Sequence, residues 1–102
     1  MPDTAVFVII EVLAVHDPAG LKDYQERASA LIGPLGGVLL ARGGTSLDGE
    51  PGFAPLAIQR WSSEAAFRDW LNSVAYQPLR KIRIASATMR VAIVPILAGT
   101  GA

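Results

Sequence analysis

The sequence predicts an α+β fold whose secondary structure follows the order βαββαβ. Two observations indicate it. Residues 6–15 and 88–97 are rich in β-branched side chains and are apolar on both faces, as in strands that need cover on two sides. Between them, stretches with helical spacing alternate with two shorter apolar runs. We expect one domain over residues 1–102, because this length suffices for a single core.

The first half of the chain is predicted to be a strand, a helix and a second strand. Residues 6–15 form a nearly continuous hydrophobic run, which is typical of a central strand. A helix is expected to follow, because Asp17 can accept hydrogen bonds from unsatisfied backbone N–H groups and Pro18 at the first helical position needs none. The glycines and proline at 33–37 end this helix. Residues 38–42 form the second strand.

The second half is predicted to repeat the pattern in the order strand, helix, strand. Residues 47–52 are rich in Gly, Asp and Pro and predict a loop, and residues 56–61 predict the third strand. Ser62 or Ser63 is expected to cap the second helix, whose helical spacing resumes after Pro78. Thr88 begins the last strand, and residues 98–102 are expected to be a flexible tail.

This order is that of ferredoxin-like folds, which have a four-stranded antiparallel sheet and both helices on one face. The first and third strands then lie centrally, and the second and fourth lie at the edges. Pro95 agrees with an edge position for the last strand, because proline cannot donate a hydrogen bond to a neighbouring strand.

The other face of the predicted sheet has no helix to cover it. Four strands of about 17 Å, spaced by about 4.8 Å, present on the order of 300 Å² of flat, largely apolar area. Monomers seldom expose such a patch, so we expect a two-fold homodimer in which the open sheet faces pack together. Glu11 and Arg90 interrupt their strands on opposite alternation phases, so at most one is expected to face the dimer cleft.

Composition excludes several classes of function. Nine basic and nine acidic residues give no net charge, so neither nucleic acid nor an anionic membrane is an expected partner. The chain has no cysteine, which excludes disulfides, thiolate metal sites and a cysteine nucleophile. Glu11 interrupts the only long apolar run, so we expect this run to be neither a signal peptide nor a membrane span. We expect a cytoplasmic protein.

Several motifs occur along the chain at characteristic spacings. They are Asp17-Pro18 with Tyr24, Gly36-Gly37, Ala41-Arg42-Gly43-Gly44, and Trp70, Ser73 and Tyr76 in a Trp-x-x-Ser-x-x-Tyr spacing. In these motifs the chain resembles the DUF1330 family, an uncharacterised branch of the dimeric α/β-barrel superfamily. The resemblance implies a dimeric barrel in which two sheets pack together. Relatives in that superfamily include cofactor-independent monooxygenases, muconolactone isomerase-like enzymes, haem-degrading proteins and stress-related proteins, and fold alone does not choose among them.

Arg42 is the first candidate for ligand binding. It stands near the end of a predicted strand, beside Gly43 and Gly44, which permit a ligand or another backbone to approach closely. A guanidinium can bind a carboxylate through two parallel hydrogen bonds. The alternative is a structural ion pair with Glu11 or with a carboxylate of a partner subunit.

Glu11 and His16 are the candidates for proton transfer. Burial of Glu11 among apolar side chains would raise its pKa and suit a general acid or base, whereas pairing with Arg42, Arg60 or Arg90 would make it structural. His16 is the only histidine, and it follows the first strand as either a general base or an ordinary loop residue. No His or Cys spacing predicts a metal site, and no cofactor is expected.

Two tyrosines and one basic cluster complete the candidates. The hydroxyls of Tyr24 and Tyr76 could reach a ligand pocket or satisfy a backbone carbonyl. Residues 80–83 carry three basic side chains, which we interpret as a solvated helix face.

Two functional hypotheses remain open at this point. The first is a small cofactor-independent enzyme, monooxygenase-like or isomerase-like, that acts on a small carboxylate or aromatic metabolite. The second is a non-catalytic dimeric module that binds a small ligand or is purely structural. A cavity on which Arg42 and an acid-base residue converge would favour the enzyme.

Overall fold

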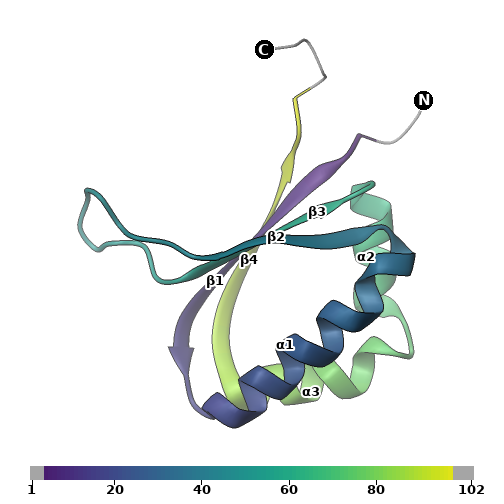
Figure 1. Cartoon of the computed structure of the whole chain (residues 1–102), viewed down its shortest axis with the longest axis horizontal. Helices are drawn as coiled ribbons and strands as arrows, with labels where there is room; N and C mark the ends of the chain where they lie inside the picture. Colours follow the sequence, from purple (N-terminus) through teal and green to yellow (C-terminus); the bar gives the residue numbers. More distant parts are fainter. Residues whose placement is uncertain (1–3, 98–102) are drawn as a thin grey trace.

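The computed structural model describes residues 4–97 and places four antiparallel strands in one sheet, in the order β2-β3-β1-β4. The strands are β1 (Val6–Val15), β2 (Gly37–Gly43), β3 (Leu56–Trp61) and β4 (Ala87–Pro95). The helices α1 (Pro18–Ile32), α2 (Glu64–Asn72) and α3 (Tyr76–Ser86) lie together on one side of this sheet (Figure 1). These elements confirm the predicted ferredoxin-like α+β fold.

The strand order also confirms which strands are central. β1 pairs with β3 on one side and with β4 on the other, and β2 closes the far edge by pairing with β3. Pro95 therefore lies on an edge strand, opposite Val6, where no further strand needs its missing N–H.

Helix α1 begins where the sequence predicts. The Asp17 carboxylate accepts a hydrogen bond from the Gly20 N–H at 3.1 Å, and Pro18 occupies the first helical position. A short 3₁₀ turn (Gly33–Leu35) follows the helix and ends at Gly36, whose φ of 101° is a left-handed conformation that favours glycine. The chain can then turn directly into β2.

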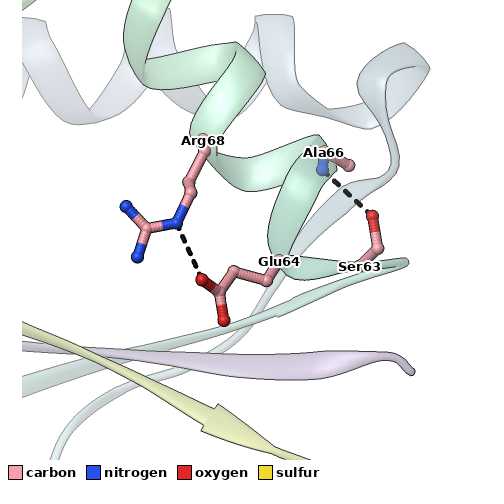
Figure 2. A network of polar contacts seen from close by, with 4 residues as sticks. All are labelled: Ser63, Glu64, Ala66 and Arg68. Atoms are coloured by element: carbon pink, nitrogen blue, oxygen red, sulfur yellow. Dashed lines mark hydrogen bonds and ion pairs between the residues drawn. The ribbon is translucent and has the colours of Figure 1, made fainter. Parts of the chain in front are cut away.

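Helix α2 is capped by Ser63 and not by Ser62. The Ser63 hydroxyl accepts a hydrogen bond from the Ala66 N–H at 3.0 Å (Figure 2). One turn along the same helix, Arg68 donates to Glu64 at 2.7 Å. This ion pair is exposed and spans one turn, so it contributes only about 0.3–0.5 kcal/mol to stability.

Helix α3 begins at Tyr76, earlier than the predicted resumption after Pro78. Pro78 lies in the first helical turn, where backbone N–H groups have no partner within the helix, so proline is tolerated there. The helix leads without a loop into β4, which covers Ala87–Pro95 and not residues 88–97 as predicted. The predicted tail at 98–102 lies outside the described residues.

The hydrophobic core lies between the helices and the sheet. Trp61 and Val8 are fully buried on the sheet side, and Trp70 and Tyr76 are buried on the helix side. The rings of Trp61 and Phe67 meet edge-to-face with centroids 5.4 Å apart.

None of the helices within residues 4–97 combines the length and apolarity needed to cross a bilayer.

The sheet face opposite the helices carries mainly apolar side chains. Residues directly opposite one another in antiparallel strands project to the same face, so Phe7 shares this open face with Arg60 and Val94. The next row on the same face consists of Ala41, Ile58, Ile9 and Ala92. Val94 remains 43% exposed in the single chain.

The expectation that Glu11 and Arg90 lie on opposite alternation phases is wrong. Glu11 pairs directly with Arg90 across β1 and β4, so both side chains project from the open face. Side-chain alternation shows which residues of one strand share a face. It does not show which of those faces matches a face of the neighbouring strand until the register between the strands is known.

Candidate functional site

Arg42 lies on the helix-covered face of the sheet, at its β2 edge. It stands opposite Ala57 of β3, which in turn stands opposite Ile10 of β1, and Ile10 packs against the core. A shift in register between Leu39 and Ala41 sets this orientation, because one extra residue in β2 moves Arg42 from the open face to the helix face. The bulge therefore directs the guanidinium toward α1.

A groove between α1 and β2 receives the Arg42 side chain. Its volume is about 290 Å³, and its lining residues are Lys22, Gln25, Glu26, Ser29, Leu39 and Arg42. The groove adjoins a narrow inner pocket of about 40 Å³ beneath α1, since Gln25, Ser29, Leu39 and Arg42 line both cavities. The inner pocket adds Tyr24, Gln59 and Met89 among its walls.

The Arg42 guanidinium has no carboxylate within 4 Å among residues 4–97, so neither Glu11 nor another described acid neutralises it. Glu26 lines the same groove, but its carboxylate lies 3.9 Å from Lys22. Arg42 can therefore use its hydrogen-bond donors on a ligand in the groove.

Tyr24 is the tyrosine that lines the inner pocket. Its hydroxyl lies 3.1 Å from the hydroxyl of Tyr76, and the two rings meet edge-to-face. Burial, reinforced by Tyr76, raises the pKa of Tyr24 well above its usual value of 10.0, and Arg83 acts in the opposite direction. Tyr24 therefore stays protonated and acts as a hydrogen-bond donor or acceptor rather than a base.

The structure brings only some of the predicted ligand-binding residues together. Arg42 and Tyr24 line the same inner pocket, whereas Tyr76 reaches this site only through its hydrogen bond to Tyr24. Gly43 ends β2 and Gly44 follows it, with φ values of 104° and 110°, and neither lines the groove. Their left-handed backbone turns the chain away after Arg42.

Glu11 lies on the other face of the sheet from Arg42. Its carboxylate accepts hydrogen bonds from Arg90 Nε at 2.7 Å and from the Ala54 N–H at 2.9 Å. The Ala54 hydrogen bond, followed by that of Arg90, lowers the pKa of Glu11 below its usual 4.5. Glu11 is thus an ionised carboxylate held by Arg90, the third of the predicted arginine partners.

His16 lies at the end of β1 and is exposed. Its Nε2 is 2.8 Å from the Thr88 hydroxyl, and its backbone N–H donates to the Ser86 carbonyl at 2.7 Å. His16 does not line the Arg42 groove. Across residues 4–97, no cluster of three His, Cys, Asp or Glu side chains is placed to hold a metal ion.

Reasoning from the sequence missed Gln25 and Ser29 of α1 as lining residues. Gln25 and Ser29 are four residues apart in the sequence, so they lie on one face of the helix, next to the face that carries Tyr24 and Ala28. That spacing was visible in the sequence. The proximity of this helix face to Arg42 was not, because it depends on the β2 bulge.

Comparison with solved structures finds the same fold in several other proteins. A protein of unknown function from Rhodopseudomonas palustris, RPA0582, matches with a TM-score of 0.76 and 18% identity, over 94% of this chain and 85% of that chain. SnoaB, a cofactor-independent oxygenase from Streptomyces nogalater, matches with a TM-score of 0.65 and 21% identity, over 96% and 97%. NE2512 from Nitrosomonas europaea, also of unknown function, matches with a TM-score of 0.56 and 17% identity, over 97% and 94%.

At these identities the structural likenesses concern the fold. No curated protein matches the sequence. The model of a domain of unknown function, DUF1330, matches residues 5–97, which is nearly the whole chain. The chain therefore belongs to the DUF1330 family.

Proposed function

We propose that this chain is a small homodimeric protein that binds a carboxylate-bearing metabolite in the groove between α1 and β2. The observation that carries the proposal is the position of Arg42, which lines the groove and has no carboxylate partner within residues 4–97. A guanidinium offers a rigid pair of N–H donors that matches the two oxygens of a carboxylate.

The walls of the groove suggest the rest of the ligand. Gln25 and Ser29 offer amide and hydroxyl groups beside Arg42, and Leu39 offers an apolar surface. The inner pocket of about 40 Å³ has room for one small group of the ligand next to Tyr24. A short carboxylic acid with a compact oxygen-bearing substituent suits this arrangement, since Tyr24 can donate to that oxygen.

The homodimer is proposed from the apolar open face. Phe7, Ile9 and Ile58 lie on it, with Val94 at its β4 edge, and no described element of the single chain covers them. A second copy has the same patch, so a two-fold axis brings two apolar surfaces together.

Catalysis is a second candidate, favoured by the protonated tyrosine in the wall of the inner pocket. Tyr24 could stabilise an enolate or phenolate oxygen of the bound ligand by donating a hydrogen bond. SnoaB, which shares this fold, is a cofactor-independent oxygenase. Binding remains the better supported function, because Glu11 and His16 do not converge on Arg42.

The test is a panel of small carboxylates, each matched to its primary amide, titrated into ¹⁵N-labelled protein by NMR. We expect the acids to shift backbone signals of Gln25, Ser29 and Arg42, and the amides to leave them in place. Arg42→Gln should weaken binding on the order of tenfold or more, because it removes charge-assisted hydrogen bonds.

Arg68→Gln is the matched control. Arg68 is an exposed arginine on α2, away from the groove, and its loss should leave the titration unchanged. Equal binding to wild type and Arg42→Gln would contradict the proposal.

A further inference from the structure

A second cleft lies at the opposite edge of the sheet, between α2, α3 and β4. Its volume is about 350 Å³. Phe67, Leu71 and Val91 give it apolar walls, and Asn72, Arg80 and Arg83 give it polar ones. Val91 and Arg42 stand at opposite ends of one row of side chains that crosses all four strands on the helix face. The cleft and the Arg42 groove are therefore two separate sites.

The two arginines project to one side of α3. Residues three apart are neighbours on a helix surface, so Arg80 and Arg83 both reach the cleft while Lys81 does not line it. Neither guanidinium lies within 4 Å of a carboxylate among residues 4–97, and no acidic side chain lines the cleft. Arg80 and Lys81 are exposed, as the prediction of a solvated basic face expects, whereas Arg83 is half-buried, and both arginines also border the cleft.

Stabilisation of the helix dipole is the ordinary role of a basic residue in the last turn of a helix, and Arg83 is in that position. This role does not explain Arg80, which lies one turn earlier. It also does not explain why both arginines border apolar walls formed by another helix and a strand. The combination is typical of a small-molecule site, in which apolar walls hold the ligand body and a few polar groups orient it.

We propose that this cleft binds a planar aromatic carboxylate. The ring lies against Phe67, Leu71 and Val91, and the carboxylate meets Arg80 and Arg83, with the Asn72 amide beside it. Arginine suits this ligand because its guanidinium both binds carboxylates through two hydrogen bonds and stacks on aromatic faces. The volume is within the usual range of ligand pockets, which begins at about 300 Å³.

Tyr76 and Arg83 link this cleft to the inner pocket beside Arg42 without merging the two. Tyr76 lines the cleft, is only 1% exposed, and its hydroxyl pairs with that of Tyr24. Arg83 also lines the cleft and acts to lower the pKa of Tyr24. The inference does not depend on the proposed function of the Arg42 groove, because none of the groove's charged residues lines the cleft.

The experiment uses 2-naphthoate as the probe and 2-naphthalenemethanol as its uncharged analogue, in NMR titrations of the full chain. We expect 2-naphthoate to shift the signals of Leu71, Arg80 and Val91, and to bind at least tenfold more tightly than the alcohol. Arg80→Gln should weaken naphthoate binding on the order of tenfold, and the double variant with Arg83→Gln should weaken it further. Lys81→Gln, which removes a charge from the same helix outside the cleft, should bind as wild type does.

Three results would overturn the inference. They are equal affinity for acid and alcohol, unchanged binding in Arg80→Gln, and shifts confined to the Arg42 groove that Arg42→Gln abolishes. Thermal denaturation of each variant by circular dichroism shows that it is folded. Arg80→Gln alone suffices if the double variant is unstable, because Arg80 is an exposed residue.

Discussion

Glu11 and Arg90 form an ion pair directly across two neighbouring strands, with Arg90 Nε donating to Glu11 Oε1 at 2.7 Å. The second carboxylate oxygen accepts from the Ala54 N–H, and Glu11 is only 8% exposed. This pair lies on the open sheet face that we propose to be the dimer interface. A neutralised, hydrogen-bonded carboxylate can be buried there at a far lower cost than an isolated one.

The stability of the protein should depend on the ionisation of Glu11. Its pKa in the folded chain is lowered from 4.5, so the ionised carboxylate stabilises the fold above that pH, and this contribution is lost as the pH falls through the folded-state pKa. Glu11→Gln should therefore lower Tm at pH 7, and the difference from wild type should shrink on acidification. Thermal denaturation from pH 3 to pH 8 at one protein concentration measures it.

Glu26→Gln is the matched control for that experiment. Glu26 is exposed and pairs loosely with Lys22 at 3.9 Å, so its loss should change Tm little at pH 7. An equal drop in Tm for the two variants would show that the Arg90 pair is not what stabilises the fold.

The hydroxyls of Tyr24 and Tyr76 should prove energetically coupled. Tyr24→Phe or Tyr76→Phe alone leaves a largely buried hydroxyl without its partner at 3.1 Å, which should cost about 1–2 kcal/mol of unfolding free energy. The double variant removes both hydroxyls and should cost less than the sum of the single variants. Urea denaturation of the four proteins gives the coupling, and strict additivity would speak against a mutual hydrogen bond.

Gly37 and Gly33 should respond in opposite ways to alanine. A Cβ at Gly37 would lie 2.6 Å from the ring of Trp61, which is fully buried, so Gly37→Ala should destabilise the fold by about 1–3 kcal/mol. A Cβ at Gly33 meets nothing within 4 Å, and its backbone is helical, so Gly33→Ala should be neutral or stabilising by up to about 1 kcal/mol. Chemical denaturation compares them, and similar losses would contradict this packing of Trp61.

A charge on the open face should separate the proposed dimer. Val94 is 43% exposed on that face, and Val94→Asp would place two unpaired carboxylates at a two-fold interface. Leu47→Asp is the control, because Leu47 is 98% exposed in the loop between β2 and β3. Sedimentation velocity should show monomers for Val94→Asp and dimers for wild type and Leu47→Asp. Monomeric wild-type protein would refute the interface.

Local signals predicted the elements of this fold because each depends on neighbouring residues. Asp17 and Pro18 start α1 through contacts within one turn. The nearly continuous apolar run of β1 reflects its central place in the sheet, and Pro95 marks an edge strand. Such signals do not require knowledge of the tertiary fold.

The candidate site was less predictable because it depends on register between distant strands and on helix docking. Alternation alone would place Arg42 on the same face as Val38, and the bulge after Leu39 reverses it. The pairing of Glu11 with Arg90 joins residues 79 positions apart. Tyr24 and Tyr76 meet only because α1 packs against α3.

Native mass spectrometry of protein purified without denaturation tests whether the chain is a dimer that binds a small acid through Arg42. We expect a mass of two chains carrying a small acidic molecule, and we expect the Arg42→Gln protein to keep the dimer and lose the adduct. Single chains with nothing bound, or an adduct that Arg42→Gln retains, would contradict this expectation.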